Sequence, residues 1–159
     1  MSRVAIKSHF GFSFIELIIV ISTIGLLAVL STVSFKNFNN HEALTKDADK
    51  VAAVIEEARI LSQSSKNGSV FGVHFENSKA VRFKGQTYSA SNSENVPEPL
   101  NSLVQLSVIS LNGGSVDAVF SRLGGTTTSF GTLTFALRAD AAQTKTITIY
   151  KTGLIEISK

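Results

Sequence analysis

Apolar residues follow three successive patterns along the chain, and the first is a nearly unbroken apolar run. It covers residues 12–30 and is interrupted only by Ser13, Glu16, Ser22, Thr23 and Gly25. A helix rises about 1.5 Å per residue, so a run of this length just crosses a hydrocarbon layer of about 30 Å. The run therefore predicts a transmembrane helix.

The second pattern is that of an amphipathic helix. Five apolar residues are spaced four, three, four and three positions apart, as on one helical face: Leu44, Ala48, Val51, Ile55 and Ala58. We expect this face to pack on a sheet. Residues 35–40 contain three asparagines, which are poor helix formers, so this segment forms either a hinge or a continuation of the helix. We favour a continuous helix that ends near Ser65, with Gly68 in a left-handed conformation.

In the third pattern, after Gly68, apolar residues alternate with polar ones, as in strands. The alternation predicts strands at residues 71–75, 81–83, 103–111, 116–122, 130–138, 145–151 and 154–157. Residues 85–100 contain both prolines and are interpreted as an irregular loop. The turn Asn112-Gly113-Gly114 predicts a hairpin between its flanking strands. Together the patterns predict an α+β fold, in which one long helix packs on an antiparallel β head.

Composition and charge narrow the possible functions. The 159-residue chain has no cysteine, which excludes disulfides, thiolate metal sites and a cysteine nucleophile. Its formal net charge is +3, but Arg3 and Lys7 precede the apolar run, and without them 13 basic residues face 12 acidic ones. A general polyanion-binding surface is therefore not indicated. The same two basic residues predict a cytoplasmic N-terminus, with the rest of the chain on the other side of the membrane.

Glu16 is the only charged residue within the apolar run. A charged side chain at membrane depth costs at least about 2.5 kcal/mol, so it indicates a function and a partner. Two plainer interpretations fit the apolar run itself: a secretory signal peptide cleaved near Ser34, and an uncleaved signal anchor. Neither of them gives Glu16 a role, so we favour a functional carboxylate.

The basic leader, Gly11, Phe12 and a glutamate five residues after the glycine together resemble the processing signal of type IV pilins and type II secretion pseudopilins. The resemblance implies that prepilin peptidase cuts after Gly11 and that Phe12 becomes the N-methylated N-terminus. It also implies that Glu16 pairs with the terminal ammonium of a neighbouring subunit during assembly. The implied division of the chain is a leader (1–11), a transmembrane assembly helix (12–34), an amphipathic helical segment (35–66) and a β head (67–159).

Three segments nearer the C-terminus resemble the GspH/FimT-like group of minor pilins and pseudopilins: residues 120–124, 133–137 and 147–155. This group implies a sandwich-like head on the helix. It further implies a single-pass protein of the bacterial inner membrane, whose head lies in the periplasm or at the cell surface before it joins a filament. The expected partners are other pilin or pseudopilin subunits, the prepilin peptidase/methyltransferase and inner-membrane lipid.

The sequence contains no recognisable catalytic or metal-binding pattern. No metal-ligand spacing links the histidines, His9, His41 and His74. The carboxylates beyond residue 115 lie on separate predicted elements, without a pair for acid–base chemistry. We therefore expect no enzyme activity, no cofactor and no metal.

Two functions remain. The first is a structural subunit, a minor pilin or pseudopilin of a type IV pilus or type II secretion filament, polymerised through its N-terminal helix. The second is a minor pilin that binds DNA for uptake, since five basic residues face two acidic ones beyond residue 120. The candidate contacts are Arg138, Lys145, Lys151 and Lys159. Lys145 and Lys151 are six residues apart in one predicted strand, which predicts a shared face. The alternative, lysines that protect an exposed sheet edge, is the one we favour.

Overall fold

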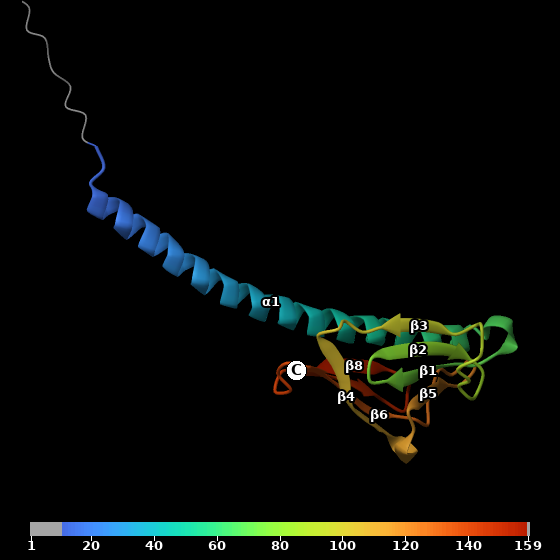
Figure 1. Ribbon diagram of the computed structural model, residues 1–159. Coiled ribbons are helices and arrows are strands. Elements are labelled where there is room, and N and C mark those ends of the chain that lie inside the picture. Colours follow the sequence, from blue (N-terminus) through green and yellow to red (C-terminus); the bar gives the residue numbers. More distant parts are fainter. Residues whose placement is uncertain (1–10, 159) are drawn as a thin grey trace, which may run out of the picture. The chain divides into compact units, whose positions relative to one another are not determined.

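The computed structural model describes residues 11–158, apart from the side chains of residues 30–37 and of Lys66 (Figure 1). The chain divides into two compact units, Met1–Phe38 and Asn39–Lys159. Helix α1 (Phe14–Gln63) includes residues of both units, and residues 35–40 are helical, as favoured from the sequence.

Helix α1 has a recognisable signal at each end. At the start, the carbonyl of Ser13 accepts the N–H of Leu17 at 3.2 Å, which makes Ser13 the N-cap residue. At the other end the chain enters the short helix η1 (Lys66–Gly68), where Asn67 and Gly68 have φ values of 55° and 66°. Left-handed residues of this kind end helices, and the left-handed conformation predicted for Gly68 is confirmed.

The head contains two four-stranded antiparallel sheets. Sheet A has, in spatial order, β3 (Val96–Pro99), β2 (Lys79–Lys84), β1 (Phe71–Glu76) and β5 (Asp117–Phe120). Sheet B has β4 (Val104–Leu111), β6 (Gly131–Leu137), β7 (Thr144–Ile149) and β8 (Ile155–Ser158). The predicted α+β fold, a helix packed on antiparallel sheet, is confirmed.

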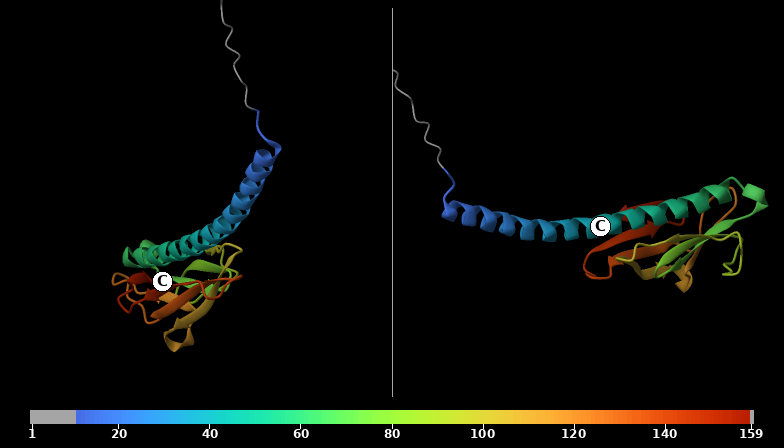
Figure 2. Two further views of the ribbon diagram at one scale, coloured as in Figure 1. Left: turned by 90° about the vertical axis from the view of Figure 1, so that its left-hand side faces the viewer. Right: turned by 45° about the horizontal axis from the view of Figure 1, so that its top comes forward.

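The C-terminal half of α1 and both sheets share one hydrophobic core. Within the head this part of the helix runs along the strands in each view (Figure 2). All five apolar residues of the predicted helical face are buried to 1% exposure or less: Leu44, Ala48, Val51, Ile55 and Ala58. They join buried side chains from six strands, among them Phe75, Phe120, Phe135 and Ile147. The predicted packing of this face is confirmed.

Two strand predictions were wrong. Residues 96–99 are not irregular but form β3, which pairs with β2 in the register Ala80↔Glu98. Proline lacks the N–H that a central strand needs, but β3 lies at the sheet edge, where Pro97 and Pro99 are tolerated. The Asn112-Gly113-Gly114 turn also does not close a hairpin, because β4 belongs to sheet B and β5 to sheet A. The turn instead carries the chain from one sheet to the other.

Among the described residues, no helix combines the length and the apolar character needed to cross a membrane.

Candidate functional site

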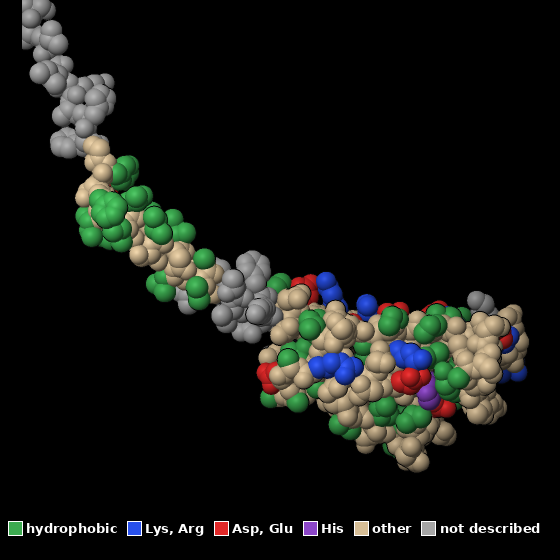
Figure 3. All heavy atoms as spheres, viewed as in Figure 1, with side chains coloured by type: hydrophobic (Ala, Val, Ile, Leu, Met, Phe, Trp, Pro, Cys, Tyr) green, Lys and Arg blue, Asp and Glu red, His purple; other side chains and the backbone are tan. Residues whose placement is uncertain are grey.

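The N-terminal part of α1 exposes apolar side chains all around its circumference. Between 44% and 77% of each of the following is exposed: Phe14, Ile15, Leu17, Ile18, Ile19, Val20, Ile21, Ile24 and Leu26. The consecutive positions from Leu17 to Ile21 alone cover every direction around a helix of 3.6 residues per turn. Figure 3 shows this apolar surface on the described N-terminal segment, whereas the head carries scattered charges of both signs. A helix that is apolar on all sides is normally buried in protein or lipid.

The processing and assembly residues lie at the beginning of this segment. Gly11 and Phe12 precede the helix, and 84% of Phe12 is exposed. Glu16 lies in the first turn of α1, where a carboxylate also interacts favourably with the helix dipole. Its position three residues after the N-cap Ser13 matches a capping box, a second possible role for the same side chain. The leader residues Arg3 and Lys7 lie outside the described residues.

The candidate DNA contacts in the described part of the chain, Arg138, Lys145 and Lys151, do not form one basic face. Lys145 pairs with the fully buried Phe135 in the β6–β7 register, and directly paired residues point to the same side of a sheet. Lys145 is accordingly half-buried on the core side of β7. Lys151 lies beyond the end of β7, in a turn, with its ammonium 4.6 Å from the ring centroid of Phe130. The predicted shared face of Lys145 and Lys151 was therefore wrong.

Arg138 does not restore such a face. Arg138 is exposed, and its guanidinium donates to the amide oxygens of Gln105 and Asn77, each at 3.3 Å. Asn77 lies in the turn between β1 and β2, so Arg138 connects the edge of sheet B to sheet A. Lys159 lies outside the described residues.

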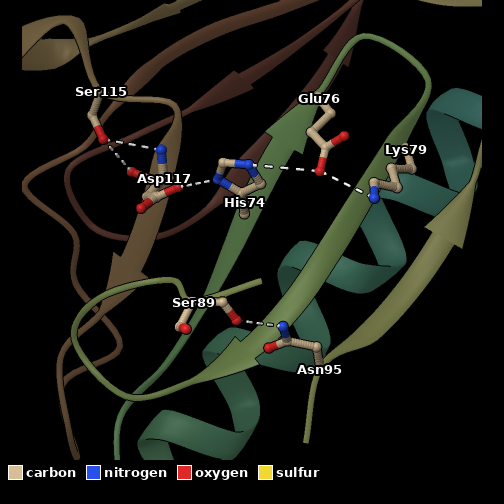
Figure 4. A network of polar contacts seen from close by, with 7 residues as sticks. All are labelled: His74, Glu76, Lys79, Ser89, Asn95, Ser115 and Asp117. Atoms are coloured by element: carbon tan, nitrogen blue, oxygen red, sulfur yellow. Dashed lines mark hydrogen bonds and ion pairs between the residues drawn. The ribbon is translucent and has the colours of Figure 1, made fainter. Parts of the chain in front are cut away.

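A polar cluster on the outer face of sheet A centres on His74 (Figure 4). The Nδ1 atom of His74 lies 2.6 Å from the carboxylate of Asp117 on the neighbouring strand β5. Its Nε2 atom faces Glu76 at 3.8 Å, and Glu76 in turn pairs with Lys79 at 3.2 Å. A histidine held by an aspartate is half of an acid–base system, but here the second nitrogen faces a carboxylate rather than a hydroxyl nucleophile. The geometry therefore favours a structural role.

The ring of Tyr88 covers this cluster from the loop that follows β2. It stacks on His74 with centroids 3.9 Å apart and meets Phe83 edge-on at 5.6 Å. Phe83 can lie flat across β1 because its neighbour is Gly72, where a Cβ atom would come within 2.7 Å of the Phe83 ring. The same loop is fastened by an ion pair between Lys84 and Glu94 at 3.0 Å. Sequence reasoning did not find the partners of His74.

An open groove of about 700 Å³ lies beside β5. Most of its side chains carry hydroxyl or amide groups: Gln86, Thr87, Ser115, Ser121, Thr126, Thr127, Thr128 and Ser129. Part of the groove wall is already paired, since Ser115 Oγ bonds both the N–H and the carbonyl of Asp117, at 3.0 and 2.9 Å. Within the described part of the chain, no three metal-ligating side chains come together. The groove thus offers a mainly polar surface.

A long N-terminal helix whose second half packs on an antiparallel β head is the fold of pilins. A type IV minor pilin of Pseudomonas aeruginosa strain PAO1, FimU, has a similar crystal structure, with a TM-score of 0.54. The alignment covers 73% of this chain and 93% of the FimU chain at 13% sequence identity. At this identity the similarity establishes the fold alone. By sequence, the chain matches no known family profile and no curated protein.

Proposed function

We propose that this protein is a structural subunit of a pilin-type filament, a type IV pilus or a type II secretion filament, and that it polymerises through residues 12–34. The observation that carries the proposal is the N-terminal part of α1, whose apolar side chains are exposed on every side and whose first turn holds Glu16. The pilin fold of the head and its similarity to FimU support the same function.

The energetics of the exposed segment require a partner. Covering one large aliphatic or aromatic side chain contributes about 1.5–3 kcal/mol, and at least nine such side chains are exposed here. Before assembly, we propose that inner-membrane lipid covers them. This membrane segment is inferred from the sequence, in which the apolar run continues to residue 30. In the filament, the helices of neighbouring subunits take the place of lipid.

Glu16 determines how one subunit meets the next. We propose that prepilin peptidase/methyltransferase cuts after Gly11 and methylates the new N-terminus at Phe12. The ammonium of Phe12 on one subunit then pairs with the Glu16 carboxylate of its neighbour. In an apolar environment such a pair is much stronger than in water, because the dielectric is low. The exposure of Glu16 in the isolated chain leaves its carboxylate accessible to this partner.

Intact mass of the membrane-extracted protein tests processing. The mature chain should lack eleven residues and carry one additional methyl group, and Gly11→Leu should retain the leader. A mature chain that begins near Phe35 would identify an ordinary signal peptide instead, and an uncut chain would identify a signal anchor.

Two substitutions separate the assembly role of Glu16 from helix capping. Glu16→Gln preserves the capping-box pattern but removes the charge, whereas Ser13→Ala removes the N-cap and preserves the carboxylate. We expect Glu16→Gln to be processed normally but to be incorporated poorly into sheared filaments. Ser13→Ala should be incorporated nearly as well as wild type. Normal incorporation of Glu16→Gln would overturn the proposed ion pair.

We do not propose DNA binding. Lys145 faces the core side of its sheet, Lys151 lies over Phe130, and Arg138 is bonded to two amides. No observation in the described residues gathers these groups into a surface that follows a phosphate backbone.

A further inference from the structure

The turn after β5 holds a leucine in an unfavourable environment in two respects. Leu123 has a φ of 62°, in the left-handed region that residues with a Cβ atom rarely adopt. Its side chain is also 75% exposed. Strained residues of this kind persist where the surrounding structure fixes them, and they are concentrated at functional sites. The packing of the head gives no reason to present a leucine here.

Hydrogen bonds hold this turn together and join it to α1 and to the residues that directly follow α1. The N–H of Leu123 donates to the carbonyl of Ser62 at 3.2 Å, and the N–H of Gly125 donates to the carbonyl of Ser121 at 2.9 Å. The adjacent Arg122 donates from Nε to Ser65 Oγ at 3.2 Å. Leu123 is therefore a preorganised apolar projection with an exposed arginine beside it. A side chain that is already held in place loses little conformational freedom on binding, and arginine is enriched among the residues that dominate the binding energy of protein interfaces.

A complementary depression lies at the other end of the head. It has a volume of about 290 Å³ and is lined by His41, Leu44, Ala142, Gln143, Thr144 and Lys145. This is slightly below the size of pockets for small-molecule ligands, about 300–1,000 Å³, and suits one or two side chains. The carboxylate of Asp140 is fixed beside it by the N–H of Ala142 at 3.1 Å and the amide of Gln143 at 2.9 Å.

The two features lie at opposite ends of one buried helical segment. The depression includes Leu44, and the turn is bonded to Ser62, which is 18 residues further along α1. At about 1.5 Å per residue this separation is about 27 Å. A contact between the turn of one copy and the depression of another joins different surfaces, and contacts of this heterologous type repeat into open filaments.

We propose that the head binds a second copy of this chain end to end: Leu123 of one copy enters the depression beside Leu44 and Ala142 of the next, and Arg122 pairs with Asp140. The Arg122 guanidinium and the Asp140 carboxylate have opposite charges, and the Leu123 side chain meets Leu44 and Ala142 between the polar side chains that line the rest of the depression. The inference rests on the proposed function, because a filament holds its subunits in parallel and so brings these two ends together.

Disulfide cross-linking in membranes tests the contact directly, because the full-length chain has no cysteine of its own. Leu123→Cys and Ala142→Cys are expressed together as separate chains and oxidised. We expect a disulfide-linked dimer from the mixture and monomers from either variant alone. The double variant should give a ladder of dimers, trimers and larger species. Two residues at opposite ends of one head are too far apart to cross-link within a chain, since a disulfide requires Cα atoms within about 7 Å.

A matched control uses Val108→Cys, which is 51% exposed on sheet B, in place of Ala142→Cys, and should give no dimer with Leu123→Cys. Arg122→Asp should weaken the cross-link between Leu123→Cys and Ala142→Cys, and Asp140→Arg in the partner chain should restore it.

Sheared filaments that contain the chain without any Leu123–Ala142 cross-link would overturn this contact and leave the proposed function intact. A cross-link from Leu123→Cys to a different protein would also overturn it. Loss of filaments and cross-links alike would overturn both proposals.

Discussion

The imidazole of His74 and the carboxylate of Asp117 lie 2.6 Å apart, although 43 residues separate them in the chain. They come from neighbouring strands of sheet A, and both side chains are largely buried, with 17% and 27% exposed. If Asp117 were removed, the His74 N–H would stay buried without an acceptor, and the cost of removing it from water would no longer be offset. The stability of sheet A therefore depends on this contact.

Asp117→Ala should therefore destabilise the protein by about 1–3 kcal/mol, because Nδ1 of His74 loses its acceptor. His74→Phe should cost less than Asp117→Ala, since a phenyl ring can still stack on Tyr88 and leaves no donor unpaired. Thermal unfolding of the full-length protein in detergent measures both. The double variant should show a coupling energy above about 0.5 kcal/mol, and additive effects would mean that the contact is not energetically important.

A second prediction concerns Asp47, a buried carboxylate on α1. The pKa of Asp47 is raised, mainly because burial disfavours the charged form. The hydrogen bond from the Asn101 N–H at 2.6 Å and the ammonium of Lys50 both lower this pKa, but their effect is smaller than that of burial. Because the pKa is higher in the folded state than the ordinary 3.8, protonation favours folding. The stabilisation from this group is complete below pH 3.8 and is lost as the pH rises through the raised pKa.

Asp47→Asn keeps an acceptor for the Asn101 N–H and cannot ionise. Its melting temperature relative to wild type should therefore increase from pH 3 to pH 7. Asp49→Asn, at an exposed position of the same helix, is the matched control and should show almost no such trend. A relative melting temperature that decreases over this range would contradict the assigned role of burial.

Gly153 should be much less replaceable than Gly113, although both have φ values near 80°, at 80° and 75°. Alanine at Gly113 meets open space, so Gly113→Ala should cost only the left-handed strain of about 1–2 kcal/mol. At Gly153 the added Cβ atom would overlap the carbonyl oxygen of Gly125, so the turn must also move. Chemical denaturation measures the free energy of unfolding of both variants. Equal losses of this free energy would show that the turn moves away from the added Cβ atom at position 153 without cost.

Val51→Asp should prevent the head from folding. Val51 is 1% exposed on the helical face that packs against the strands, and a carboxylate there would be buried without a partner. Ala53→Asp, two residues further on and exposed, should change stability by no more than about 0.5 kcal/mol. Limited proteolysis of the full-length proteins distinguishes them, because only the Val51 variant should lose its resistant head fragment.

The helix was predictable from sequence because its signals are local. The spacing of Leu44, Ala48, Val51, Ile55 and Ala58 depends only on the helical repeat, and all five are buried as predicted. The left-handed conformation of Gly68, which lies shortly after the end of α1 at Gln63, was predictable because it depends on the backbone freedom of the glycine itself. The early position of Glu16 was readable for the same reason, since it depends on a short stretch of sequence.

The arrangement of strands depends on distant partners and was less predictable. The prolines of β3 argue against a strand unless its position at a sheet edge is known. The shared face of Lys145 and Lys151 failed because β7 ends at Ile149, before the second lysine. No local signal could pair His74 with Asp117, or place Tyr88 over them. The Leu123 turn was also missed, because strain and exposure are properties of the folded chain.

The buried face of α1 has a mechanical consequence. The apolar side chains from Leu44 to Ala58 lie on one hydrogen-bonded stretch of helix within the head, so a force that pulls this stretch along its own axis acts on all of them at once. Force in this direction loads the five interlocked side chains in shear. They must slide together past the strands, whereas a force across the axis would detach them one at a time. A helix held in this way resists extraction from the head along its axis more strongly than the equilibrium stability of the head alone would indicate.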